Sequence, residues 1–386
     1  MQASPPYNFH EILSNFCITG AIEEVKPFGS GHINGTFYVK NKQTDQPDFL
    51  LQLINSHVFS NVAVLSQNIQ LVTSHLRYKL SLLNHHDIAN RVLTLVPAND
   101  QTYYYKDENT NYWRVYLYIK KTKSYDQATT THQAYQSGLA FGQFQSLLID
   151  LDAGSLQETI PNFHDVDYRL QNLQNAVKKD PVHRLNECAG EIEFIEQHAG
   201  EMRYILQMQQ KGQLPLRITH NDTKFNNVLL DENDCAQCVI DLDTVMPGLV
   251  AYDFGDAIRT IVNTAPEDEA DLSKIDVNID LFTAYTHGYL KQAVSFLTNN
   301  ELASLLHGAF LLPYMQAVRF LTDFIEGDHY YKIQSPQHNL QRAKAQIQLL
   351  TKLQQHKCEL RSIIDHIAAS LPYEMQIPDQ NLNEPA

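Results

Sequence analysis

One stretch, residues 218–246, constrains the fold most, because it carries a strand–turn–strand pattern with polar residues at both ends. An apolar run at 228–230, a turn-rich tetrad at 231–234 and a second apolar run that ends at 239–240 predict a β-hairpin. A hairpin folds back so that its two ends meet. We therefore expect the polar residues before the hairpin to lie beside those that follow it.

The polar residues of this stretch are of the types that phosphoryl transfer requires. That chemistry needs a carboxylate to orient and deprotonate a hydroxyl, and hard oxygen ligands for Mg²⁺. Asp222 is the candidate base, and Lys224 can reach the phosphoryl group as it moves. Asn227 and Asp241 are candidate metal ligands, with Asp243 as a further one. The alternative is an acidic surface hairpin with a chance scatter of Asp and Asn.

The charge and composition of the chain argue against several classes of function. A net charge of −15 over 386 residues argues against a nucleic-acid binder, which would show a basic patch, and against docking on an anionic membrane. No apolar run is long enough to cross a bilayer, and no secretory signal is visible. Five scattered cysteines fit reduced thiols. We expect a cytoplasmic monomer or weak homodimer with a small-molecule partner and neither a nucleic-acid nor a membrane partner.

A glycine-rich motif lies at 27–39 and reads Pro-Phe-Gly-Ser-Gly-His-Ile-Asn-Gly-Thr-Phe-Tyr-Val. Extended apolar runs flank it on both sides, which argues against a dinucleotide fingerprint and against a Walker-type loop, because both of these lead into a helix. A glycine-rich turn inside a hairpin can cover nucleotide phosphates with backbone N–H groups. Gly29, Ser30, Gly31 and His32 are the candidate nucleotide-binding residues.

Strand patterns dominate the first part of the chain and helical patterns the rest. Besides the glycine-rich hairpin, strands are expected at 49–54, 91–95, 103–105 and 112–119. From Ala128 onward the period is helical. We expect an α+β fold with a small antiparallel β-sheet lobe at 1–119, a hinge at 120–124 and a mostly helical lobe at 125–386.

Two sequence blocks carry a family resemblance. His-x-Asp-x-Lys-x-x-Asn, beginning at His220, and Ile-Asp-x-Asp, beginning at Ile240, resemble the catalytic and metal loops of the protein-kinase-like superfamily, and more closely those of the aminoglycoside phosphotransferase-like kinases. Supporting blocks are Phe28-Gly-Ser-Gly-His-Ile-Asn-Gly-Thr, Leu51-Gln-x-Ile-Asn, Asp253-Phe-Gly-Asp-x-Ile-Arg and Arg319-Phe-Leu-Thr-Asp. Together the blocks look like those of the N-acetylhexosamine 1-kinases within that group.

The resemblance implies a bilobal protein-kinase-like fold that uses ATP and Mg²⁺. It implies transfer of the γ-phosphate to the anomeric hydroxyl of a sugar such as an N-acetylhexosamine. By motif position it makes Asp222 the base and Asn227 and Asp241 the magnesium ligands. It also places Arg319 where the family contacts sugar, and Asn34, a candidate substrate residue, in the glycine-rich turn.

The strand at 49–54 departs from the wider kinase pattern, which places a lysine on this strand and a glutamate on the following helix. This strand has no cation, Leu53 stands where the resemblance leads us to expect a basic residue, and the helix offers Gln67 in place of a carboxylate. Gln52 or Lys224 can substitute in gripping phosphate, or the protein is a catalytically impaired binding module.

Two polar positions beyond the hairpin need separate interpretations. Asp253-Phe-Gly lies too far past Asp222 to be a metal motif, so we expect Asp253 to brace a loop or begin a helix. Arg319 and Asp323 lie four residues apart within a nearly all-apolar helical stretch at 302–325. They form an internal ion pair, or they contact a polar substrate.

Two rival functions remain open. The first is a kinase for another hydroxyl substrate, an aminoglycoside or an amino alcohol, whose positive charge would favour an acidic pocket. The second is a kinase-fold binding module without catalysis, which the missing lysine and glutamate favour. An acceptor panel tests the first rival, and binding of Mg-ATP tests the second.

Overall fold

The computed structural model describes residues 7–29 and 33–371, and their contacts group into two compact units. The first unit comprises Met1–Ser124, Asp150–Phe163 and Asn227–Pro247, and the second comprises Tyr125–Ile149, His164–Asn226 and Gly248–Ala386. The chain thus passes between the units several times. The two lobe limits expected from the sequence stay a prediction.

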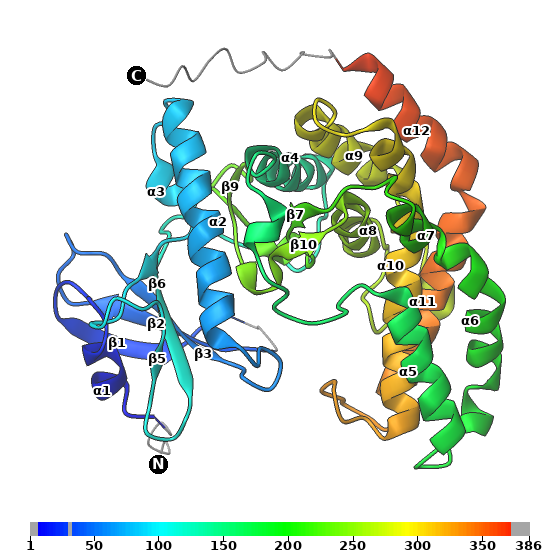
Figure 1. Cartoon of the computed structure of the whole chain (residues 1–386), viewed down its shortest axis with the longest axis horizontal. Coiled ribbons are helices and arrows are strands. Elements are labelled where there is room, and N and C mark those ends of the chain that lie inside the picture. Colours follow the sequence, from blue (N-terminus) through cyan, green and yellow to red (C-terminus); the bar gives the residue numbers. More distant parts are fainter. Residues whose placement is uncertain (1–6, 30–32, 372–386) are drawn as a thin grey trace. The chain divides into compact units, whose positions relative to one another are not determined.

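The first unit is built on one antiparallel sheet, drawn in blue and cyan in Figure 1. Its strands are β1 (Ile22–Pro27), β2 (Gly35–Asn41), β3 (Phe49–Ile54), β4 (Leu95–Val96), β5 (Tyr105–Lys106) and β6 (Tyr112–Leu117). The order is β1-β2-β3-β6-β4, and β5 also pairs with β6. The sheet therefore places β3 and β6 side by side although they are far apart in the sequence. Gln52 of β3, for example, pairs with Arg114 of β6, 62 residues later in the chain.

The two faces of this sheet differ in chemistry, because successive side chains in a strand point to opposite sides. One face carries Leu51 and Trp113, fully buried in a core shared with helix α1 (Phe9–Ser14). Leu53 packs on this same core face. The opposite face carries the polar residues of β3 and β6, among them Gln52. A basic residue at position 53 would therefore point into the apolar core.

The strand expected at 91–95 is wrong over most of its length. Helix α3 (Ile88–Arg91) ends where that strand was expected to begin, and β4 starts only at Leu95. The reason lies in α2 (Val62–Leu82), whose Arg77 guanidinium donates to the carbonyls of Val92 and Leu93 at 2.8 and 2.7 Å. Those carbonyls are thus satisfied outside a strand ladder.

The second unit is mostly helical. Its helices are α4 (Thr131–Leu147), α5 (Val166–Lys179), α6 (Ala189–Met202), α7 (Tyr204–Gln210), α8 (Val250–Ile261), α9 (Ile279–Ala293), α10 (Asn299–Glu326), α11 (His338–Gln355) and α12 (Lys357–Ser370). Two short strands, β7 (Arg217–Thr219) and β10 (Met246–Gly248), also lie in or border this part. With the sheet of the first unit, these helices confirm the expected α+β fold class.

Helix α10 is the central element of the second unit, and it packs against α5, α8 and α11. A capping box between Thr298 and Glu301 begins it, and Gly327 ends it with a φ of 105°. Its side chains are buried on nearly every side, as the apolar sequence predicts. The helix can therefore hold functional residues in fixed positions.

The crossing of α8 and α10 depends on two glycines. A Cβ added at Gly255 would meet the backbone of Gly308, and one added at Gly308 would meet the backbone of Ala251. We expect Gly308→Ala to lower the free energy of unfolding by about 1–3 kcal/mol, because the helices cannot approach as closely. Gly200→Ala is the control: it lies in α6 with no heavy atom within 4 Å of the added Cβ.

Thermal denaturation of the two variants tests this prediction. The control should be neutral or slightly stabilised, because alanine favours a helix over glycine by up to about 1 kcal/mol. Equal melting temperatures for Gly308→Ala and wild type would contradict the close-packing interpretation.

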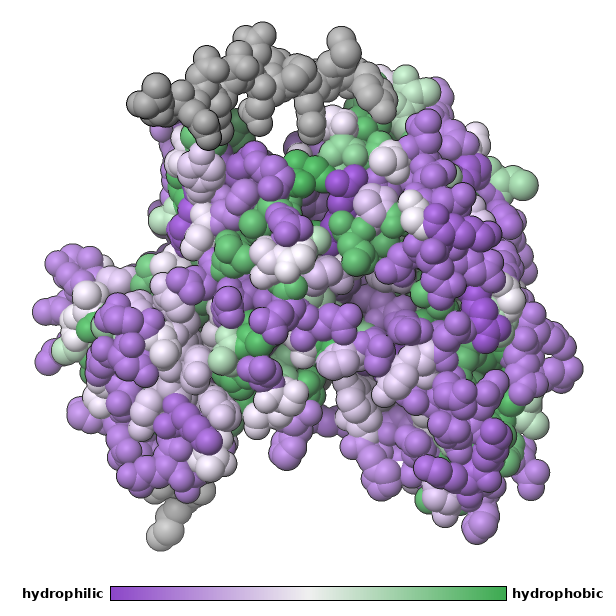
Figure 2. Space-filling view, viewed as in Figure 1, coloured by the Kyte–Doolittle hydropathy of each residue, from purple (hydrophilic) through white to green (hydrophobic). Residues whose placement is uncertain are grey.

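The surface in Figure 2 is mostly hydrophilic, with hydrophobic side chains in scattered small groups. Within residues 7–29 and 33–371, no helix combines the length and the apolarity that a membrane crossing requires.

Candidate active site

The loop that carries the candidate base is braced by Asp253 of α8. The backbone N–H groups of His220 and Asn221 donate to its carboxylate at 2.9 and 2.7 Å, and the Gln145 side chain donates at 2.7 Å. The Thr223 hydroxyl donates to the Asp253 carbonyl at 2.5 Å. These bonds hold the backbone on both sides of position 222, and they confirm the expected bracing role of Asp253.

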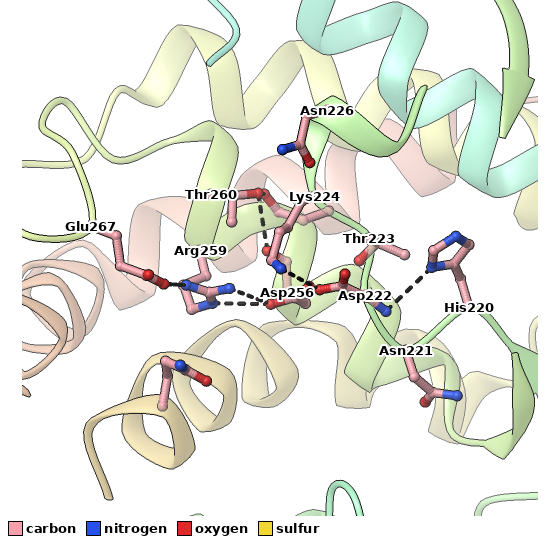
Figure 3. Close-up of polar contacts among 12 residues, drawn as sticks. His220, Asn221, Asp222, Thr223, Lys224, Asn226, Asp256, Arg259, Thr260 and Glu267 are labelled. Carbon is pink, nitrogen blue, oxygen red and sulfur yellow. Dashed lines mark hydrogen bonds and ion pairs between the residues drawn. The ribbon is translucent and has the colours of Figure 1, made fainter. Parts of the chain in front are cut away.

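Asp222 itself forms an ion pair with Lys224, with Nζ 2.8 Å from Oδ1 (Figure 3). Burial alone would raise the pKa of the carboxyl, but the attraction of Lys224 outweighs it, so the pKa of Asp222 lies below its ordinary value. Burial opposes the charge of Lys224 too, yet Asp222 and the nearby Asp256 raise the pKa of its ammonium. The residue predicted to be the base is therefore an ionised carboxylate at neutral pH.

A second ion-pair group lies beside this pair in the same unit (Figure 3). Arg259 donates to Asp256 at 2.8 and 3.0 Å and to Glu267 at 2.6 Å. One oxygen of Asp256, Oδ2, is buried without a hydrogen-bond partner. The negative charge of Asp256 is close enough to Lys224 to raise the pKa of its ammonium group.

The metal-binding candidates of the first unit are brought together by the hairpin. Strands β8 (Val228–Leu230) and β9 (Ala236–Val239) pair antiparallel, which confirms the hairpin prediction. Beyond the paired strands, the N–H of Ile240 donates to the carbonyl of Asn227 at 2.9 Å. Asn227 thus lies next to the residue that precedes Asp241.

Asp241 lies directly after the hairpin in a left-handed turn. It is exposed and left-handed, with φ 61° and ψ 57°, a conformation that costs most residues about 1–2 kcal/mol but that Asp tolerates. The left-handed turn redirects the chain directly after the hairpin, into a 3₁₀ helix at Leu242–Thr244.

The donor set at this end of the hairpin fits Mg²⁺. Magnesium is usually held by one or two carboxylates together with phosphate and water oxygens, and not by an all-protein cage. Asn227 and Asp241 offer a carboxamide and a carboxylate oxygen, both hard ligands. The described part of the chain contains no group of three or more His, Cys, Asp or Glu that could hold a metal ion.

Asp243, the further metal candidate, is engaged by other side chains. Its two carboxylate oxygens accept from the guanidinium of Arg114 at 2.5 and 2.9 Å, and one also accepts from Asn34 at 2.7 Å. Arg114 donates through Nε to Gln52 at 2.9 Å, and Gln52 donates to Thr36 at 3.1 Å. Any metal would compete with Arg114 for Asp243, so a metal role for Asp243 stays a prediction.

Arg114 supplies a cation on the same face of the sheet as Gln52. It lies on β6 directly opposite Gln52 of β3, and Gln52 in turn lies opposite Thr36 of β2. Arg114 is 1% exposed. Burial disfavours its charge, but Asp243 outweighs burial and raises the pKa of Arg114 further. Nearby Asp241 acts in the same direction.

The kinase pattern did not predict Arg114, because that pattern places its cation on β3 and Arg114 lies on β6. The available signal was a single arginine within the aromatic strand Tyr-Trp-Arg-Val-Tyr-Leu at 112–117. A charge in such a strand is unfavourable when buried unless a partner neutralises it. The partner is Asp243, 129 residues away in sequence.

The candidate nucleotide-binding turn is only partly described. Ser30, Gly31 and His32 lie outside the described residues, and Gly29 has a φ of 76°, which favours glycine. Asn34 accepts from the N–H of Asn55 at 2.9 Å and donates to Asp243. Its contacts therefore belong to the Arg114 network, and its substrate role stays a prediction.

Arg319 and Asp323 have different surroundings. The Asp323 carboxylate accepts from the backbone N–H groups of His329, Tyr330 and Tyr331 at 2.9, 2.8 and 3.0 Å. It also accepts from the Asn339 side chain at 2.8 Å. Asp323 therefore shapes the loop after α10. Arg319 donates to Gln316 at 3.2 Å and lines a pocket.

Comparisons with known proteins define the class of the fold. The chain is similar to the solved structure of a microcompartment-associated aminopropanol kinase, with a TM-score of 0.62 and 15% identity over 92% of this chain and 98% of that chain. It is similar to an aminoglycoside phosphotransferase from Alicyclobacillus acidocaldarius, with a TM-score of 0.58 and 13% identity over 94% and 98%. It is also similar to a choline kinase from Cryptosporidium parvum, with a TM-score of 0.53 and 14% identity over 89% of this chain and 93% of that chain. The fold is that of the kinase-like phosphotransferases.

The family of this chain is shown by the match of its sequence to a family model. A profile described as the phosphotransferase enzyme family matches residues 24–275, more than half of the chain. The chain belongs to this family and is a small-molecule kinase.

Proposed function

We propose that this protein uses ATP and Mg²⁺ to phosphorylate the anomeric hydroxyl of an N-acetylhexosamine. The observation that carries the proposal is the Asp222–Lys224 ion pair in a loop braced by Asp253, within a chain of the phosphotransferase family. A fixed, ionised carboxylate beside a cation is what general-base catalysis of phosphoryl transfer requires. The motif blocks at His220 and Ile240 support a sugar 1-kinase within that class.

Each residue then has a defined task. Asp222 orients the acceptor hydroxyl and takes its proton. Lys224, paired with Asp222 in the ground state, stabilises negative charge on the phosphoryl group during transfer. Asn227 and Asp241 hold Mg²⁺, which, when bound, neutralises charge on the nucleotide phosphates. Arg114 positions the metal loop by holding Asp243, two residues beyond Asp241.

An acceptor panel tests the proposal. ADP release is measured with ATP, Mg²⁺ and, in separate reactions, N-acetylglucosamine, N-acetylgalactosamine, ethanolamine, choline and an aminoglycoside. We expect the largest kcat/KM with an N-acetylhexosamine. A larger kcat/KM with any amine acceptor would contradict the sugar assignment and leave the kinase class intact.

The low pKa of Asp222 predicts the pH dependence of turnover. A base must be ionised, and a pKa below the ordinary value keeps Asp222 ionised throughout the range from about pH 5 to 8. Protonation of Asp222 should therefore cause no fall in the wild-type kcat as the pH is lowered through that range. Lys224→Met removes the charge that lowers the pKa of Asp222, so burial should raise that pKa and move the fall of kcat at acidic pH to higher pH. Identical apparent pKa values in the two profiles would rule out this coupling.

A kinase-fold binding module without catalysis is the second candidate function. It was favoured by the missing cation on β3, and Arg114 places a cation one strand away on the same face as Gln52. Calorimetric titration with Mg-ATP distinguishes the two functions. We expect binding, and weaker binding in an Asp241→Asn variant; no heat of binding with wild type would favour a module without catalysis.

A further inference from the structure

Helix α8 carries three charged residues at regular spacings of three: Asp253, Asp256 and Arg259. Residues three apart in a helix lie on the same face. The face that braces the catalytic loop through Asp253 therefore also presents Asp256, about one turn later. Asp253 holds the backbone of that loop, whereas Asp256 lies beside two of the side chains that the loop carries, Asp222 and Lys224 (Figure 3).

Asp256 uses only one of its two carboxylate oxygens. Arg259 donates to Oδ1 through Nε at 3.0 Å and through a terminal nitrogen at 2.8 Å. The other oxygen, Oδ2, accepts no hydrogen bond from the described residues, and Asp256 as a whole is 5% exposed. A buried carboxylate oxygen without a donor is unfavourable, so Oδ2 would gain from an N–H group that reaches it during the reaction cycle.

Lys224 is a cation that can supply this N–H group. Its ammonium has three donors, and it pairs with Asp222 Oδ1 at 2.8 Å. Burial opposes the charge of Lys224, but Asp222 and then Asp256 raise the pKa of the ammonium in spite of it, so the attraction of Asp256 already reaches Lys224. Because a lysine ammonium lies at the end of a flexible four-carbon stem, a turn of the stem can carry it from one carboxylate to the other.

The proposed chemistry requires a second anion for Lys224. When Asp222 takes the proton of the acceptor, its carboxyl becomes neutral, and Lys224 loses its anionic partner as charge develops on the phosphoryl group. Before that moment the ion pair lowers the pKa of Asp222, which weakens it as a base. A nearby carboxylate that takes the ammonium while Asp222 takes the proton meets both requirements.

We propose that Asp256 is a positioning residue whose Oδ2 receives the Lys224 ammonium when Asp222 accepts the proton of the acceptor hydroxyl. The inference rests on the proposed kinase function and on the role of Asp222 as its base. The acceptor oxygen bonds to the γ-phosphorus as the bond to ADP breaks, the proton remains on Asp222 until solvent takes it, and Lys224 keeps its charge throughout. Arg259 holds the Asp256 carboxylate in place through Oδ1.

A double-mutant cycle tests the proposal with the best acceptor of the panel. Asp256→Asn keeps an oxygen for Arg259 and removes the charge. We expect it to lower kcat about tenfold, a coupling typical of neighbouring charged residues, with little change in KM for ATP or acceptor. In a Lys224→Met background the same substitution should change kcat less than about twofold, because Asp256 acts through Lys224. An equal loss in both backgrounds, or none in either, would overturn the inference.

The matched control is Glu267→Gln. It removes a carboxylate charge from the same ion-pair group, on the other side of Arg259, to which Glu267 is bound at 2.6 Å (Figure 3). We expect its kcat to stay within about twofold of wild type, the limit for uncoupled sites. A loss as large as that of Asp256→Asn would show that the ion-pair group has a structural role only, and would overturn the inference.

A crystal structure of Asp222→Asn without substrates separates this inference from the proposed function. The variant imitates the protonated base and requires no turnover, and it leaves Asp256 unchanged. We expect Lys224 Nζ to lie within about 3.2 Å of Asp256 Oδ2, a hydrogen-bond distance. Lys224 still at residue 222, or turned into solvent, would overturn the inference. If no sugar is phosphorylated, the 1-kinase proposal fails, and this structure still decides the inference.

Discussion

Asp222→Ala should lower kcat by about 10²–10⁴, because the reaction loses its general base. The fold should survive, because the backbone around position 222 is held by Asp253 and not by the Asp222 side chain. Turnover is measured as ADP release at saturating ATP and acceptor, and folding is measured by thermal denaturation. Asp222→Asn, which keeps the shape and removes the charge, should lose activity to a similar degree.

The control for the loss of a carboxylate is Glu232→Gln, at an exposed position in the turn of the β8–β9 hairpin. It should retain wild-type turnover. An Asp222→Ala variant that keeps more than about a tenth of wild-type kcat would remove Asp222 from the role of base.

Arg114→Met should reduce the free energy of unfolding by about 3–5 kcal/mol, because it leaves the Asp243 carboxylate buried without its cation. Turnover should fall as well, since Asp243 lies two residues beyond the metal candidate Asp241. Chemical denaturation gives the stability, and the dependence of ADP release on Mg²⁺ concentration gives the effect on the metal loop.

The double variant Arg114→Met/Asp243→Asn separates packing from positioning. It removes both charges, and the new Asn can still accept from Asn34, so stability should largely return. If Arg114 positions the metal loop, a raised Mg²⁺ requirement should persist in the double variant. Recovery of both stability and Mg²⁺ dependence would show that the pair has a packing role only.

The hairpin could be predicted from sequence because its signals are local. The apolar runs and the turn tetrad at 231–234 specify the pairing within 218–246, and pairing alone brings Asn227 beside Ile240. The change from strand to helical period likewise predicted the α+β fold class. Both predictions depend on short-range periodicity, which a single sequence shows directly.

The Arg114 network could not be predicted in the same way, because it depends on strand register. Register decides that Arg114 faces Gln52, and long-range folding decides that Asp243 reaches Arg114. The four-residue spacing of Arg319 and Asp323 likewise did not distinguish an internal ion pair from two residues that contact a substrate. The loop after Gly327 turns back toward α10, and its backbone N–H groups donate to the Asp323 carboxylate. The sequence does not show this turn.

In the proposed reaction, the γ-phosphoryl group of ATP passes to a sugar hydroxyl whose proton Asp222 accepts. The most direct measurement follows the product by ³¹P NMR and mass spectrometry after incubation with ATP, Mg²⁺ and N-acetylglucosamine or N-acetylgalactosamine. We predict one sugar 1-phosphate for each ADP formed by wild type, and almost none with Asp222→Asn. ADP formed without a phosphorylated sugar, or phosphate on another hydroxyl, would contradict the proposed reaction.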